Sequence, residues 1–155
     1  MVKEVNNSLT EQTYLIRPEH LNSYDKLFGG KLMQWIDEMA SIVARRHCQT
    51  EITTAAIDNL NFKKSASRDD MIVLVGRVTY VGRTSMEIRV DTYVEEPDGT
   101  RKMINRAYVV MVSVDKQYKP LPVPELELKT ESEKAEWEGG KKRYELRRQR
   151  RMDGF

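Results

Sequence analysis

The segment from Lys31 to Ala44 is mostly apolar, and its few polar positions recur at helical spacing. At about 100° per residue, one narrow polar stripe is formed by Gln34, Glu38, Ser41 and Arg45. Nearly every other position is apolar, so the pattern predicts a long helix that the rest of the chain must enclose.

Downstream segments rich in Val, Ile, Thr and Tyr predict long strands at Ile52–Phe62, Met71–Val81, Ser85–Glu95 and Met103–Asp115. A short run from Gln12 to Arg17 predicts one more strand before the helix. Tight connections at Gly82-Arg83 and Pro97-Asp98-Gly99 are typical of antiparallel hairpins. We therefore expect an α+β fold in which an antiparallel sheet curls around one long central helix.

The strands differ in how their side chains alternate. Ser85–Glu95 alternates regularly, and we expect its polar face, which includes Glu87, Arg89 and Asp91, to meet water. The run from Val109 to Val114 is apolar on both faces, which indicates a central strand or one covered by another subunit.

The C-terminal part of the chain has a different character. Prolines between Pro120 and Pro124 end the strands, and Glu131–Arg151 predicts a charged helix broken at Gly139-Gly140. We expect one domain over residues 1–124, with residues 125–155 as a charged helical extension of it. The segment Lys141–Arg151 has seven basic residues and one acidic residue, as expected for a solvated helix or for a surface that binds a phosphorylated ligand, an anionic surface or nucleic acid.

Composition narrows the function classes. The chain has 155 residues and a net charge of +2, which is too balanced to indicate a nucleic-acid-binding protein by itself. No apolar run approaches the roughly 20 residues that a bilayer requires, and the first residues do not form a secretory signal. The single cysteine, Cys48, agrees with a reducing compartment, so we expect a cytoplasmic protein without membrane insertion. With His20, His47 and Cys48 as the soft ligands, we expect no metal site.

Ordered motifs along the chain support a family assignment. They are Asn22, Phe28-Gly-Gly30, Trp35-Ile-Asp-Glu38, Arg46-His-Cys48, Asn59-Leu-Asn-Phe62, Gly82-Arg-Thr-Ser-Met-Glu87 and Leu121-Pro-Val-Pro124. From about residue 10 to the C-terminus, this set resembles the hotdog-fold acyl-coenzyme A thioesterases. It is most similar to the cytosolic long-chain acyl-coenzyme A hydrolases and their single-domain bacterial relatives. The resemblance implies a hotdog fold and hydrolysis of an acyl-coenzyme A to a fatty acid and coenzyme A.

Thioester hydrolysis requires a base for the attacking water and hydrogen-bond donors for the developing oxyanion. Asp37 lies at the edge of the polar stripe against apolar residues, so we expect its carboxylate to be half desolvated and suited to accept a proton. It acts as general base or as nucleophile, or else it pairs structurally with Arg45 or Arg46. Gly29 and Gly30 offer backbone amides at the helix start for an oxyanion hole, or they serve the turn alone.

Two loop residues complete the predicted chemistry. Asn22 can hold the attacking water or the thioester oxygen, although loop asparagines often serve turns. The resemblance implies that Asn22 and Asp37 face one another across a dimer interface. His20 keeps open a hotdog dehydratase, in which a histidine acts with a carboxylate.

Coenzyme A contacts are predicted at two places. Arg83, Thr84 and Ser85 offer a cation and two hydroxyls at a turn, or form only a polar hairpin tip. Guanidinium groups match the geometry of phosphate oxygens. We therefore expect the nucleotide phosphates to be bound by Arg143, Arg147 and Arg148. The acyl chain is expected beside Met33 and Phe62, two residues that core packing also explains.

Alternatives and partners follow from the same residues. No G-x-S-x-G elbow or phosphate-binding G-x4-G-K-[ST] loop is present in the sequence. The remaining alternatives are an acyl-coenzyme A sensor without activity, the dehydratase, and an RNA- or membrane-surface-binding protein acting through the tail. We expect acyl-coenzyme A and coenzyme A as ligands, no separate cofactor and no nucleic acid. Exposed apolar surface predicts a homodimer, and the resemblance implies that three dimers form a hexamer.

Overall fold

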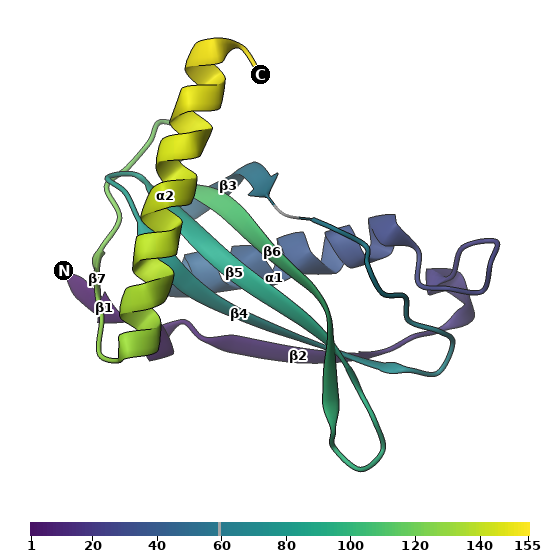
Figure 1. The fold of residues 1–155 in the computed structure, drawn as a ribbon. Coiled ribbons are helices and arrows are strands. Elements are labelled where there is room, and N and C mark those ends of the chain that lie inside the picture. The colour runs from purple at the N-terminus through teal and green to yellow at the C-terminus, as the bar shows by residue number, and fades with distance from the viewer. Residues whose placement is uncertain (59) are drawn as a thin grey trace.

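The computed structural model describes residues 1–58 and 60–155 and contains one five-stranded antiparallel sheet (Figure 1). The strand order is β2-β4-β5-β6-β3, with β2 at Thr10–Leu15, β3 at Glu51–Asp58, β4 at Met71–Val81, β5 at Ser85–Glu95 and β6 at Arg101–Val114. Helix α1 (Gly29–Cys48) lies on one face of the sheet and helix α2 (Glu131–Asp153) on the other. Two short strands, β1 (Val2–Glu4) and β7 (Glu125–Glu127), pair in parallel beside them. This arrangement confirms the predicted sheet around one long helix.

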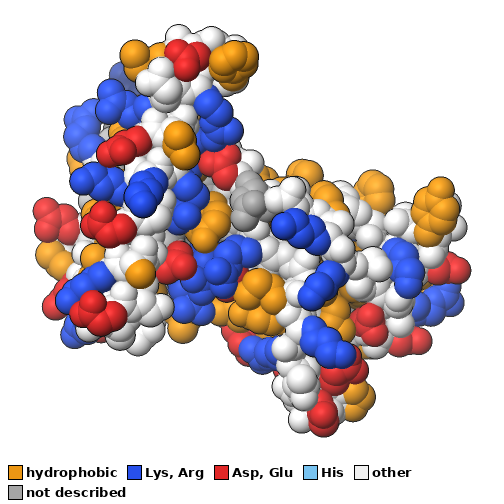
Figure 2. Space-filling model, viewed as in Figure 1, with side chains coloured by type: hydrophobic (Ala, Val, Ile, Leu, Met, Phe, Trp, Pro, Cys, Tyr) orange, Lys and Arg blue, Asp and Glu red, His pale blue; other side chains and the backbone are white. Residues whose placement is uncertain are grey.

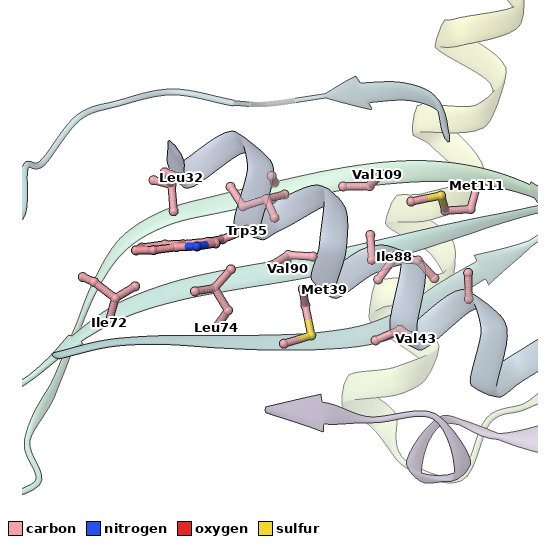
Figure 3. Packing of buried hydrophobic residues seen from close by; sticks show 14 of the residues in the cluster. Leu32, Trp35, Met39, Val43, Ile72, Leu74, Ile88, Val90, Val109 and Met111 are labelled. Atoms are coloured by element: carbon pink, nitrogen blue, oxygen red, sulfur yellow. The ribbon is translucent and has the colours of Figure 1, made fainter. Parts of the chain in front are cut away.

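The core forms between the sheet and one face of α1. Figure 3 shows Leu32, Trp35, Met39 and Val43 pointing toward the sheet residues Ile72, Leu74, Ile88, Val90, Val109 and Met111. These helix positions recur every three or four residues, so they share one face and are removed from water together. The opposite face stays open, and Met33 there is 41% exposed.

Strand boundaries differ from the prediction mainly at β3. The predicted strand extended to Phe62, but β3 ends at Asp58, and Asn59 lies outside the described residues. The Asn61 carbonyl oxygen accepts a hydrogen bond from the Asn105 side chain on β6 at 2.7 Å, and the backbone ladder between β3 and β6 ends at Asp58. The chain has therefore left the sheet, and residues 60–66 form a loop beside the start of α1.

The expectation that the polar face of β5 meets water is wrong. Glu87 and Asp91 are 1% and 0% exposed, and Arg89 is 9% exposed. Helix α2 covers this face, and its own charged side chains neutralise the buried ones: Arg143 bonds to Glu87, and Glu136 accepts from Arg89. A strand with alternating polarity is thus buried on both sides, because the polar side faces a charged helix.

The expected break in the C-terminal helix is also wrong, since α2 continues through Gly139 and Gly140. A Cβ atom at Gly140 would lie 2.5 Å from Cβ of Tyr80 and 3.0 Å from Oε1 of Glu87. The glycine therefore allows the helix backbone to approach β4 and β5 closely, instead of ending the helix. No helix among the described residues is long and apolar enough to cross a membrane.

Candidate active site

The first turn of α1 presents free backbone amides. Phe28 precedes the helix without a side-chain cap, and its own amide donates to the His20 carbonyl at 2.8 Å. Within the described part of the chain, the amides of Gly29 and Gly30 have no hydrogen-bond partner. They lie where the helix dipole favours negative charge, so they can donate to a developing oxyanion.

The side chain of Asn22 is used at one of its two ends. Its Oδ1 accepts hydrogen bonds from the amides of Tyr24 at 2.8 Å and Lys26 at 3.2 Å, which closes the loop before α1. Its Nδ2 has no partner among residues 1–58 and 60–155. The turn function and the chemical function are therefore compatible, because the amide nitrogen remains available as a donor.

Three of the predicted site residues line one cavity of about 480 Å³ at the start of α1. Asn22, Gly29 and Phe62 contribute to its wall together with Tyr24, Lys26, Leu27, Leu32, Lys64, Ser65, Ala66 and Ile104. Phe62 is 53% exposed, and its ring would be 3.3 Å from a Cβ atom at Gly29. The cavity thus joins donor groups to an apolar wall, as an acyl group and its carbonyl require.

Asp37 lies further along α1 and faces the sheet edge. Its half-buried carboxylate accepts a hydrogen bond from the hydroxyl of Thr54 on β3, with 2.7 Å between Oγ1 and Oδ1. The neighbouring Glu38 is exposed and accepts from Gln34 within the helix at 2.9 Å. The two adjacent carboxylates therefore differ: one is held against β3, and the other belongs to the solvated stripe.

Sequence reasoning missed Thr54. Threonine is common in strands because its side chain is β-branched, so its presence in β3 gave no chemical signal. Only the spatial pairing of α1 with β3 brings its hydroxyl to Asp37. The alternative pairing of Asp37 with Arg45 is not formed, because Arg45 bonds to Glu51 at 3.1 Å.

One chain does not bring Asp37 into the cavity that contains Asn22 and Gly29. Asp37 is eight residues beyond Gly29, which corresponds to about 12 Å along a helix. The carboxylate of Asp37 and the donor groups of the cavity therefore lie at two separate places on one chain, named the two half-sites.

His20 has a structural role in the loop before α1. Its Nδ1 accepts a hydrogen bond from the Arg17 amide at 3.0 Å, and its ring meets Trp35 edge-on at 5.0 Å between centroids. These contacts fix the imidazole against the core.

A second cavity, also of about 480 Å³, lies on the outer face of the sheet beside α2. Thr84, Ser85 and Arg147 line it, and its other lining residues are Ala55, Ala56, Asp58, Val110, Val112, Tyr144, Arg150, Arg151 and Phe155. Ala55 directly follows Thr54, so this cavity begins one residue from the partner of Asp37. Figure 2 shows Lys and Arg side chains gathered along α2, which borders it.

The predicted phosphate ligands have different surroundings. Arg143 binds both carboxylate oxygens of Glu87 at 2.9 Å and stacks over Tyr108 at 3.6 Å from the ring centroid. Burial raises the pKa of the Tyr108 phenol, so the ring beneath the guanidinium stays neutral at physiological pH. Arg147 is bound by Asp58, whereas Arg83 and Arg148 are exposed. No cluster of His, Cys, Asp and Glu side chains in the described residues could hold a metal ion.

The known proteins that this chain resembles include acyl-CoA thioester hydrolases. Residues 24–100 match the Thioesterase superfamily. Over 123 residues the chain is 39% identical to an uncharacterised acyl-CoA thioester hydrolase of Bacillus subtilis, covering 79% of this chain and 72% of the relative. It is 38% identical over 144 residues to a cytosolic acyl coenzyme A thioester hydrolase of Rattus norvegicus, covering 90% of this chain and 38% of that protein. The chain thus spans about two fifths of the length of the rat relative.

Solved structures are similar over nearly the whole chain. A hexameric acyl-CoA thioesterase in its apo form has a TM-score of 0.91 at 39% identity, with 96% of each chain covered. An acyl-CoA hydrolase of Staphylococcus aureus, in complex with butyryl coenzyme A, coenzyme A and coenzyme A disulfide, has a TM-score of 0.93 at 28% identity, covering 99% of this chain and 94% of that one. Variants of the latter enzyme replace an asparagine, an aspartate and a threonine with alanine.

Proposed function

This chain belongs to the thioesterase superfamily, and on that premise we propose that it hydrolyses acyl-coenzyme A thioesters to a free acid and coenzyme A. The observation that carries the proposal is the hydrogen bond between Asp37 and Thr54 at the edge of the sheet. The asparagine, aspartate and threonine replaced in the Staphylococcus aureus enzyme have the same spacing as Asn22, Asp37 and Thr54. This agreement supports a shared catalytic set.

In the proposed reaction, Asp37 acts as the base. A water molecule attacks the thioester carbonyl carbon while the Asp37 carboxylate takes one of its protons. The carbon–sulfur bond then breaks, and the same proton passes to the leaving thiolate of coenzyme A. The hydroxyl of Thr54 fixes one carboxylate oxygen, so the other oxygen is oriented for the water.

The cavity at the start of α1 supplies the electrophilic half of the proposed site. Amides of Gly29 and Gly30 stabilise the oxygen that becomes negative in the tetrahedral intermediate. The Nδ2 group of Asn22 donates either to that oxygen or to the water, because its Oδ1 is engaged in the loop. Phe62 lines the path of the acyl chain.

Two subunits complete one site in this proposal. Donors and carboxylate lie about 12 Å apart along one helix, so Asp37 of one subunit serves the cavity of its partner. Strand β3 is an edge of the sheet, and its small, uncharged residues Thr53, Thr54 and Ala55 are exposed. Such an edge is open to pairing with a second copy. The hexameric thioesterase that this chain resembles supports an assembly of three such dimers.

The nucleotide end of coenzyme A occupies the cavity beside α2 in this proposal. Thr84 and Ser85 supply hydroxyl groups there, and Arg83 and Arg148 are exposed cations nearby in the sequence. Arg148→Gln is expected to raise KM for acyl-coenzyme A at unchanged kcat, because a guanidinium that contacts only phosphate binds substrate and transition state equally. The same substitution should weaken inhibition by free coenzyme A. Unchanged KM and inhibition would remove Arg148 from the site.

The deciding experiment measures free thiol release from acyl-coenzyme A substrates of increasing chain length. Steady turnover with any member of the series supports the hydrolase, whereas binding without thiol release would indicate a sensor. Hydration of an enoyl-coenzyme A with no thiol release would indicate the dehydratase. A single turnover in ¹⁸O-water tests the nucleophilic role of Asp37. Label in the Asp37 carboxylate indicates an anhydride that water opens at the aspartyl carbon, and label in the fatty acid alone indicates that water attacks the acyl carbon.

A further inference from the structure

Glu87 is a carboxylate inside the protein, and its partners come from α2. It is 1% exposed on the outer face of β5, where Thr79 donates to it at 2.6 Å and Arg143 binds both of its oxygens. A buried charge of this kind persists only when fully paired. The pair therefore fixes α2 on the sheet at this point.

Arg147, one turn further along α2, joins this buried carboxylate to the edge of the sheet. Its Nη1 lies 3.5 Å from Glu87 and 3.0 Å from Asp58, and Arg150 reaches the other oxygen of Asp58 at 3.3 Å. Glu87 is on β5 and Asp58 on β3, with β6 between them. The Arg147 side chain, which is 11% exposed, thus ties the edge strand to an interior strand.

Asp58 lies in the sequence between Thr54 and the loop that carries Phe62. It is the last residue of β3, four residues after Thr54, which holds Asp37. It also precedes the loop that carries Phe62 to the cavity, and Asn105 holds that loop through the Asn61 carbonyl. Both half-sites therefore depend on where β3 ends. A β-bulge between Thr54 and Ala56 interrupts the pairing of β3 with β6, so the strand has fewer regular contacts to hold it.

We propose that Arg147 and Asp58 are positioning residues, through which α2 holds β3 so that Thr54 orients Asp37. The inference rests on the proposed hydrolase function and deepens it. It also gives Arg147 a different role from that of a phosphate ligand, because two carboxylates already surround its guanidinium. A positioning residue affects turnover, whereas a phosphate ligand affects binding.

The test is a double-mutant cycle measured with butyryl-coenzyme A. Asp58→Asn keeps the shape of the side chain but removes its charge, and Thr54→Val removes the hydroxyl that holds Asp37. We expect Asp58→Asn to lower kcat about fivefold with KM changed less than about twofold. In the Thr54→Val background the same substitution should change kcat by less than about twofold, because its effect passes through Thr54.

Matched variants exclude a general loss of folding. Lys142→Gln removes an exposed positive charge from the same helix and should leave kcat and KM unchanged. Asp58→Glu keeps the charge and should recover most of the lost kcat, and thermal melting should show each variant folded at the assay temperature. Arg147→Gln should lower kcat as Asp58→Asn does.

The outcomes separate this inference from the function on which it rests. A rise in KM at unchanged kcat for Arg147→Gln would overturn the positioning role in favour of a phosphate contact. Fully additive effects of Asp58→Asn and Thr54→Val would overturn the coupling through Thr54. Thiol release by the unaltered enzyme would in that case still support the hydrolase function. No thiol release by the unaltered enzyme would overturn both proposals.

Discussion

Asp37 and Glu38 are consecutive carboxylates on one helix, yet their surroundings give them different chemistry. The helical period alone places Asp37 at the edge of the polar stripe and Glu38 inside it, and the structure agrees with this assignment. The helical period does not indicate which residue of another element contacts Asp37. Thr54 is 17 residues away in the sequence, and only the docking of α1 on β3 brings the two side chains together.

The first prediction concerns this pair of carboxylates. Asp37→Asn should lower kcat by about 10²–10⁴-fold while acyl-coenzyme A still binds, because the amide cannot accept the proton from water. Glu38→Gln is the matched control and should retain most of the activity. Thiol release under saturating substrate measures both. If Glu38→Gln were the slower variant, the base would be one residue further along the helix.

A second prediction concerns His47, which is fully buried at the end of α1. Its Nε2 donates to the Pro124 carbonyl at 2.9 Å, and its Nδ1 has no partner among the described residues. Burial lowers the pKa of His47, although the hydrogen bond to Pro124 opposes this effect. The unfolded chain therefore binds a proton more readily than the folded one. As a result, the free energy of unfolding rises as the pH increases from the lowered folded pKa of His47 to the ordinary histidine pKa.

The stabilisation by neutral His47 should be complete above the ordinary histidine pKa of about 6.5, and lost as the pH falls toward the lower folded value. The slope from one such group is up to about 1.4 kcal/mol per pH unit. Urea unfolding between pH 7.5 and 5 measures it. His47→Gln, which can still donate to Pro124, should show a smaller pH dependence, and an unchanged slope would exclude His47 as its source.

At the scale of elements, α2 is where sequence and structure differ most. Two adjacent glycines and a high density of charge predicted an interrupted, solvated helix. The helix is continuous, and the absence of a Cβ atom at Gly140 lets it pack closely against Tyr80 of β4 and Glu87 of β5. The polar face of β5 was expected in water for a similar reason, since a pattern of alternation shows two faces but not what covers each one. The charges of β5 and of α2 are far apart in the sequence, and only the fold brings them together.

The third prediction compares the two glycines of α2. Gly140→Ala should destabilise the protein by about 1–3 kcal/mol, because the added methyl group would overlap Tyr80. Gly139→Ala should be neutral or stabilising by up to about 1 kcal/mol, since its nearest neighbour is the flexible end of Arg143 at 3.1 Å. Thermal and urea unfolding measure the difference. Equal effects of the two substitutions would mean that helix propensity, and not close packing, governs both.

For the whole molecule, the apolar pattern of α1 by itself indicates a surface that one chain leaves incomplete. A helix apolar nearly all round needs more cover than one sheet provides, and Phe28 and Met33 remain 56% and 41% exposed. An apolar surface does not indicate which element covers it, because the hydrophobic effect is not directional. The proposed shared site assigns this cover to a second copy of the chain, because Asn22 and Asp37 lie at separate places on one chain.

The fourth prediction tests the shared site directly. Asn22→Ala and Asp37→Asn proteins should each be nearly inactive, but mixing them under conditions of subunit exchange should restore activity. A heterodimer has one site with both defects and one with neither, so recovery reaches at most about half of the unaltered activity. Sedimentation confirms the assembly, and native mass spectrometry confirms exchange. Absence of recovery despite exchange would show that both residues act within one chain.

The charged layer beneath α2 has a consequence for synthesis of the protein. The five strands leave the ribosome before α2, which supplies the cations for Glu87. Until then the outer face of the growing sheet carries Glu87 without these cations, while Asp91 is already paired with Arg89 and Arg106 of the sheet. Nascent sheets with apolar outer faces associate with one another while they wait for cover. A sheet whose outer face carries these charges is less prone to such association until α2 pairs Glu87.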